Sequence, residues 1–139
     1  MAEGVFCGTW TYRSLLNDPD GSVDFNKLEF GEGTLQIDSA DQTGLSGTIG
    51  GPGWSLSLYG SCGDGSPAQI RFQGKGTVSG ELWIYDYIGW LVPVWPNSTK
   101  EQQRTAFVGS VVRTIPHSSG TGGIAPAGEV ASFYAVRVG

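Results

Sequence analysis

The chain has few charged residues and few of the side chains that bind metals or contact nucleic acids. Its 139 residues include 8 Lys or Arg, 13 Asp or Glu and one histidine, so the formal net charge is −5. Because phosphate binding needs a basic patch, this balance argues against a nucleic-acid partner. A single histidine and two cysteines without CxxC or Cys/His spacing argue against a metal site. No glycine cluster has the strand–GxGxxG–helix context of a nucleotide site, so no cofactor is expected.

The sequence also lacks the features of a membrane or exported protein. No apolar run reaches the ~20 residues that span a bilayer. The N-terminus lacks the charged-then-apolar layout of a signal peptide. These absences predict a soluble, cytoplasmic protein with no membrane partner, although a mature secreted form would look the same. Cys7 and Cys62 are expected to be small buried hydrophobes, and whether they pair is left open.

Glycine and aromatic residues, in contrast, are abundant. There are 23 glycines and 12% aromatic residues, a composition that favours an all-β domain with many tight turns. Short turns and the lack of a long helix predict an antiparallel up-and-down barrel of about eight strands rather than a βαβ fold. We expect one domain over residues 1–139. The predicted strands are 5–13, 33–38, 44–49, 54–61, 68–74, 81–91, 105–114 and 129–138.

Two connections are longer than the others. Residues 14–32 form a polar, turn-rich segment whose few apolar residues could hold it as a lid across one end of the barrel. Residues 115–128 are rich in Gly, Ser and Pro and are expected to form a flexible loop.

The first strands resemble those of a known class of small barrels. Gly8-Thr9-Trp10 is similar to the G-x-W signature that opens the calycin barrels, the lipocalins and avidins. The hairpin formed by residues 33–37 and 44–49 resembles the second and third avidin strands. The resemblance covers about a third of the chain and implies an eight-stranded barrel whose interior can hold one small, mostly apolar ligand. The segment 14–32 is longer than avidins have, and biotin binding is not implied.

The run from Glu81 to Pro96 is the longest without a turn signal and holds three of the five tryptophans. Both of its faces are apolar or aromatic, so we expect both to be covered, in a closed sheet or in an assembly. One face carries Leu82, Ile84, Asp86, Ile88 and Trp90, and the other carries Trp83, Tyr85, Tyr87 and Leu91.

Asp86 is the unusual residue of this run. If its face points to the barrel axis, as we expect, an unpaired carboxylate would be costly and should have Arg71 or Arg113 as partner. The pair could be a structural salt bridge, or Asp86 could be a general base or ligand anchor with a shifted pKa. If the faces are reversed, the aromatic side lines the pocket and Asp86 belongs to an interface.

Aromatic side chains are numerous enough to line a pocket for a flat or apolar ligand, although several could fill the core or face another subunit. The single histidine, His117, lies in a Pro-His-Ser-Ser loop and is expected to be solvated. The candidate ligand-binding residues are Trp10, Tyr12, Arg71, Trp83, Tyr85, Asp86, Tyr87, Trp90 and Arg113.

The leading functional hypothesis is a barrel that holds a small apolar or aromatic molecule in its interior. An alternative is a cofactor-free cyclase or isomerase, in which Asp86 or a tyrosine would move protons and the cavity would supply proximity. A lectin-like or assembly module is the third reading. A homo-oligomer is left open in each case.

Overall fold

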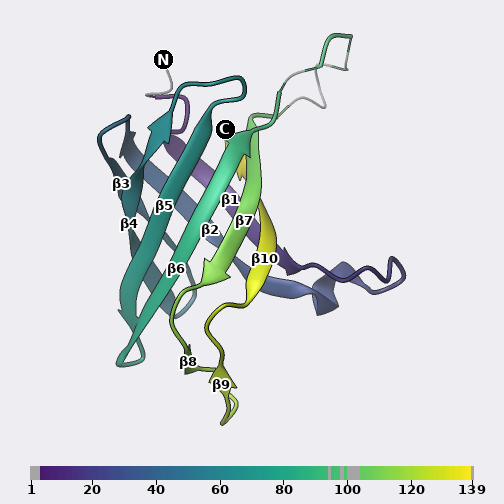
Figure 1. The fold of residues 1–139 in the computed structure, drawn as a ribbon, viewed down its shortest axis with the longest axis vertical. Helices are drawn as coiled ribbons and strands as arrows, with labels where there is room; N and C mark the ends of the chain where they lie inside the picture. Colours follow the sequence, from purple (N-terminus) through teal and green to yellow (C-terminus); the bar gives the residue numbers. More distant parts are fainter. Residues whose placement is uncertain (1–3, 94, 98, 100–103, 139) are drawn as a thin grey trace.

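A computed structural model describes residues 4–93, 95–97, 99 and 104–138. Eight antiparallel strands close into a barrel in up-and-down order, which confirms the predicted fold class (Figure 1). A short hairpin of two further strands interrupts the connection between β7 and β10, and one 3-10 turn, η1, lies between β1 and β2. The elements are β1 (Gly8–Leu16), η1 (Phe25–Lys27), β2 (Glu29–Ala40), β3 (Leu45–Gly51), β4 (Trp54–Gly63), β5 (Gln69–Val78), β6 (Glu81–Leu91), β7 (Ala106–Arg113), β8 (His117–Ser118), β9 (Ile124–Ala125) and β10 (Val130–Arg137).

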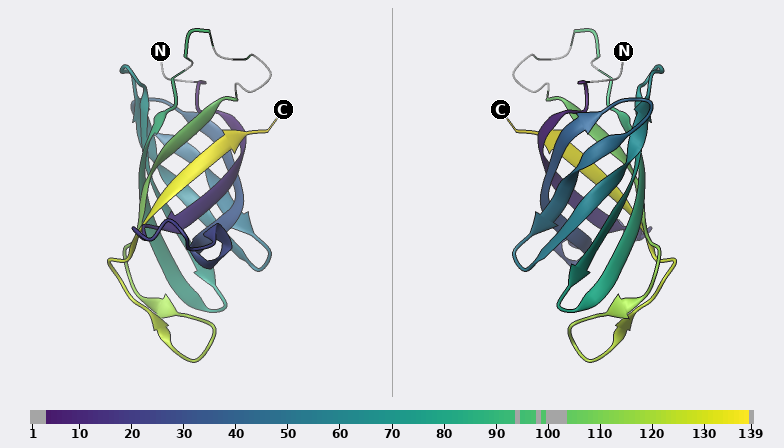
Figure 2. Two further views of the ribbon diagram at one scale, coloured as in Figure 1. Left: turned by 90° about the vertical axis from the view of Figure 1, so that its right-hand side faces the viewer. Right: turned by 90° about the vertical axis from the view of Figure 1, so that its left-hand side faces the viewer.

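Pairing of the first and last strands closes the sheet. β10 bonds to β7 on one side and to β1 on the other, with Trp10 opposite Arg137 and Tyr12 opposite Ala135. Two side views show the strands crossing the barrel at a tilt, with the β8–β9 hairpin beyond one end (Figure 2). Within the described part of the chain, no helix is long and apolar enough to cross a membrane.

The core follows from the period-2 alternation of the strands, which turns every second side chain inward. Cys62 belongs to this core, Cys7 packs against it, and no disulfide joins these two described residues. The largest fully buried side chains are Trp10, Phe6, Phe107, Leu35, Ile37, Ile49, Leu56, Leu58, Ile70 and Val111.

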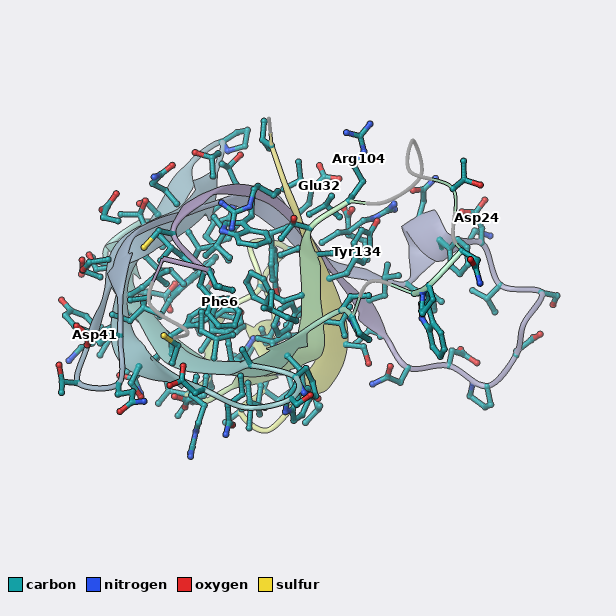
Figure 3. The ribbon with its side chains drawn as sticks, turned by 90° about the horizontal axis from the view of Figure 1, so that it is seen from above. Phe6, Asp24, Glu32, Asp41, Arg104 and Tyr134 are labelled. Atoms are coloured by element: carbon teal, nitrogen blue, oxygen red, sulfur yellow. The ribbon has the colours of Figure 1, made fainter. Side chains whose placement is uncertain are left out.

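The N-terminal segment seals one end of the barrel. Viewed from above, Phe6 lies inside the ring of strands (Figure 3). Its ring packs edge-on against Phe107 at 5.6 Å between centroids, and its carbonyl accepts a hydrogen bond from Trp10 Nε1 at 3.0 Å. The Arg137 guanidinium lies 4.5 Å from the Trp10 ring and donates to the carbonyls of Val5 and Cys7. These side chains therefore fill this end of the barrel.

Two glycines opposite each other make room for the large rings of the core. Gly89 of β6 pairs with Gly109 of β7. A Cβ at Gly109 would lie 1.8 Å from the carbonyl oxygen of Ile88, and one at Gly89 would lie 3.1 Å from the Phe133 ring. At Gly89 the missing side chain leaves room for the Phe107 and Phe133 rings, which meet edge to face with centroids 5.8 Å apart, and at Gly109 it lets the β6 backbone approach closely.

Both long connections are more ordered than the sequence predicts. Strand pairing between β1 and β2 continues as far as Leu15 and Glu29, which shortens the expected 14–32 loop to residues 17–28. This shorter segment lies beside the outer face of β7 and β10, where Asn17 accepts a hydrogen bond from Ser132, and Figure 3 shows Asp24 outside the barrel. It does not cover the open end. The 115–128 segment contains the β8–β9 hairpin.

The packing at the sealed end generates a stability prediction. Replacing Phe107 by Ala should lower the free energy of unfolding by about 3–5 kcal/mol, because Phe107 is fully buried among Phe6, Trp10 and Phe133. Its neighbour Val108 points outward and is 41% exposed, so Val108→Ala should cost less than about 1 kcal/mol. Urea denaturation measures both, and equal losses would contradict the described packing.

Candidate functional site

The end opposite Phe6 is not filled and holds a cavity of about 230 Å³. It opens beside β8, at the lower end of the barrel in Figure 1. Three larger hollows, of about 540, 640 and 480 Å³, are depressions on the outside of the barrel, across β4–β7, beside the 17–28 segment and over β4–β6. The inner cavity is bordered mainly by inward-facing side chains. Its lining residues are Tyr12, Ser14, Phe30, Gly31, Glu32, Trp54, Trp83, Tyr85, Tyr87, Val111, Arg113 and His117.

Aromatic rings form most of the cavity wall, and they contact one another. Trp83 stacks on the His117 imidazole, with centroids 3.9 Å apart and planes inclined by 12°. Trp54 lies 6.5 Å from Trp83, and Phe30 lies 6.0 Å from Tyr85, so rings from β2, β4 and β6 border one space. Such a wall suits a flat apolar molecule.

A chain of polar contacts crosses this wall from Arg113 to Ser118. Arg113 Nε donates to the Tyr85 hydroxyl oxygen at 2.9 Å, and that hydroxyl lies 2.7 Å from His117 Nε2. His117 Nδ1 lies 2.8 Å from the Ser118 carbonyl oxygen. A carbonyl can only accept, so we assign the hydrogen to Nδ1, and in the neutral ring Nε2 is then the acceptor for Tyr85.

Arg113 is a buried cation and has several partners. It is 8% exposed, and its Nη1 donates to Glu129 at 2.6 Å and to the Pro126 carbonyl at 3.2 Å. The guanidinium also lies 4.9 Å from the centre of the Phe30 ring. These contacts hold the start of β10 and the hairpin segment against the barrel mouth, and they compensate for part of the cost of burying the charge.

One polar group of the wall is poorly satisfied. The indole N–H of Trp83 is buried and has no hydrogen-bond partner among the residues described. The Ser14 hydroxyl of the same wall is fully buried, lies 3.4 Å from the Gly31 carbonyl oxygen and also hydrogen-bonds with the Tyr12 hydroxyl. A buried donor without a partner costs roughly 1–3 kcal/mol. A ligand with an acceptor atom would remove that cost at Trp83.

Burial changes the acidity of the tyrosines around the cavity. It raises the pKa of Tyr85, while the hydrogen bond from Arg113 acts in the opposite direction. Burial also raises the pKa of Tyr12 and Tyr87, which are more deeply enclosed and have no cationic neighbour among the causes of their shifts. Of the three hydroxyls, Tyr85 is thus the one whose ionised form has electrostatic support.

Five of the predicted ligand-binding residues lie in the cavity wall, and four lie elsewhere. Their role in binding stays a prediction. Trp10 is packed in the sealed end, and Arg71 and Trp90 point outward from β5 and β6. The residues brought together are Tyr12, Trp83, Tyr85, Tyr87 and Arg113.

The expectation that Asp86 faces the barrel axis is wrong. Its neighbours Tyr85 and Tyr87 are buried, so Asp86 is on the outer face of β6, where it accepts hydrogen bonds from Gln73 and Thr114. Within the described part of the chain it forms no ion pair with an arginine. The aromatic face lines the pocket instead. Alternation could not decide this because both faces of β6 are apolar.

His117 was expected to be solvated, yet it is 8% exposed and belongs to the wall. Sequence reasoning also missed Ser14, Phe30 and Glu32, because they lay in a segment interpreted as a loop. Arg113 was named only as a possible partner of Asp86, and it lies on the inner face of β7 with Val111. No local pattern marks His117, whose position depends on the hairpin folding back to β6. Among the described residues, no three His, Cys, Asp or Glu side chains are grouped as metal ligands.

Comparisons with known proteins give no family assignment. No family model matches the chain, and no curated protein or solved structure matches it significantly. The barrel agrees with a calycin-like architecture at the level of strand number, direction and closure. Function therefore has to be argued from the cavity itself.

The three enclosed tyrosines predict instability at alkaline pH. Burial raises the pKa of each above its value in the unfolded chain, so the unfolded chain loses these protons first. Their contribution is complete below about pH 10 and is lost as the pH rises further. Urea denaturation between pH 8 and 11 should show falling stability, with a smaller fall in Tyr85→Phe. Constant stability across this range would contradict the burial of the hydroxyls.

Proposed function

We propose that the barrel binds one small, flat, mostly apolar molecule that carries a hydrogen-bond acceptor. The observation that carries this proposal is the cavity with aromatic walls at the open end, which includes a buried indole N–H without a partner. An aromatic wall with few polar groups is typical of small-molecule sites. The resemblance of the first strands to calycins, whose interiors hold such ligands, supports the same conclusion.

The cavity volume limits the size of the ligand. At about 230 Å³ it is smaller than the ~300–1,000 Å³ of sites for drug-sized molecules. A molecule of one or two fused rings fits this volume better than a lipid or an oligosaccharide. The rings of Trp54, Trp83 and Tyr85 would contact its faces, and the ring stack of Trp83 on His117 keeps that side of the site rigid.

The polar groups determine which ligand would be preferred. Trp83 Nε1 has no acceptor among the described residues, and the Arg113 guanidinium, which is paired with Glu129, borders the same cavity. Glu129 forms its ion pair with Arg113 from the side of the hairpin. The Arg113 guanidinium keeps its contact with the Phe30 ring in the cavity wall. A carbonyl, hydroxyl or anionic oxygen on an aromatic ring would meet both groups.

The proposal is tested by screening one- and two-ring aromatic compounds. Compounds that bind should raise the melting temperature and change the tryptophan fluorescence, because Trp54 and Trp83 line the cavity. For a ligand with an acceptor atom, Trp83→Phe should weaken binding about tenfold through loss of the N–H donor. Calorimetric titration measures this loss.

Trp90→Phe is the matched control, because Trp90 lies on the same strand and points outward with 41% of its surface exposed. It should leave affinity unchanged. Equal losses in the two variants would place binding elsewhere, and a screen in which no compound changes the melting temperature would contradict the proposal.

A further inference from the structure

We propose that Arg113, Tyr85 and His117 act as a base that takes a proton from the bound ligand. The ligands are then weakly acidic hydroxy compounds, phenols or enols, and the site holds them as anions. This inference rests on the proposed function, because it needs the ligand in the same cavity, and it adds a chemical step that binding alone does not require.

The direction of the hydrogen bonds fits a proton acceptor. Because the Ser118 carbonyl fixes the hydrogen of neutral His117 on Nδ1, Nε2 accepts from the Tyr85 hydroxyl. Arg113 Nε donates to the same hydroxyl oxygen. Tyr85 therefore directs its own proton to the imidazole, and its oxygen can accept one more hydrogen bond from a donor in the cavity.

The proton transfer balances without any further reactant. The ligand O–H bond breaks, its electron pair stays on the ligand oxygen, and the proton forms a new O–H bond on Tyr85. The original Tyr85 O–H bond breaks at the same time, and that proton forms an N–H bond at His117 Nε2. The products are a ligand anion, an unchanged neutral Tyr85 and an imidazolium, so total charge is conserved.

Arg113 favours the anion that the transfer creates and opposes the imidazolium by like charge, and other groups favour the imidazolium. The Trp83 ring, stacked 3.9 Å from the imidazole, favours a cation over its face. The anion would lie beside the Arg113 guanidinium and within reach of the Trp83 N–H. The acidic groups nearby are Glu129, paired with Arg113, Glu32 in the wall, and Glu81, which accepts from the Ser118 backbone N–H. Glu81 favours the imidazolium from the hairpin side.

The test uses 4-nitrophenol, because its phenolate absorbs visible light where the phenol does not, and nitrobenzene as a ligand without the acidic proton. At a pH below the ionisation midpoint of free 4-nitrophenol, the wild-type protein should raise the phenolate fraction of the bound compound about tenfold. His117→Gln and Tyr85→Phe should each remove this rise. Tyr134→Phe, which changes an exposed tyrosine on the outer face of β10, should retain it.

Two further measurements separate the base from a simple electrostatic effect of Arg113. Calorimetric titrations in buffers of different ionisation enthalpy should show that wild-type protein binds 4-nitrophenol without releasing a proton to the buffer, since His117 keeps it. In His117→Gln, the ratio of the affinities for 4-nitrophenol and nitrobenzene should fall about tenfold. Because a general change in the shape of the cavity would alter the affinities for both compounds, their ratio reports the loss of the base.

The outcomes distinguish the two proposals. Phenolate formation with one proton released to the buffer would overturn the base and assign the effect to Arg113 alone. Binding of 4-nitrophenol as the neutral phenol, or binding of nitrobenzene without 4-nitrophenol, would also overturn it while the binding function stands. If the protein binds neither compound and no other small aromatic, both proposals fail.

Discussion

The hydrogen-bonded pairing of β1 with β10 is the constraint on which the other features depend. Once this pairing closes the sheet, every strand has one face inside, and the barrel volume must be filled by alternate side chains. The chain fills it unevenly. Phe6, Trp10 and Phe107 occupy the end near the N-terminus, whereas the other end is bordered by rings and left with a cavity. The site is thus a consequence of where the aromatic filling stops.

The glycines of the barrel belong to the same constraint. Large aromatic rings fit inside a narrow barrel where paired strand positions carry no side chain. Gly89 of β6 and Gly109 of β7 are paired in this way. Phe133 and Phe107 occupy the space that this pair leaves. Tyr87, two residues before Gly89 on β6, continues the core packing. Tyr85, two residues before Tyr87, lines the cavity. Residues of the core and residues of the cavity wall therefore follow one another along the same strand.

The barrel could be predicted from the sequence, because alternation and turn residues are local signals. The site could be predicted only in part. Tyr85 and Arg113 were named from their strands, but the choice of inner face for β6 was wrong, since Ile84 and Ile88 are as apolar as the rings opposite them. Position within the barrel depends on closure, and closure is not a local property. His117 reaches the wall through a hairpin that bends back, so no window of sequence contained its partners.

Arg113 and Arg137 show why the open end differs from the sealed one. Arg137 donates hydrogen bonds to the carbonyls of Val5 and Cys7, so its role is to hold the N-terminal segment in place. Arg113 donates to a titratable hydroxyl instead, and its burial costs free energy that an apolar residue of similar size would avoid. The Arg113 charge beside the Tyr85 hydroxyl adds little stability to a core that aromatic rings already fill. It does stabilise negative charge at the oxygen that faces the cavity. The placement of Arg113 therefore supports the proposal of a ligand that carries negative charge.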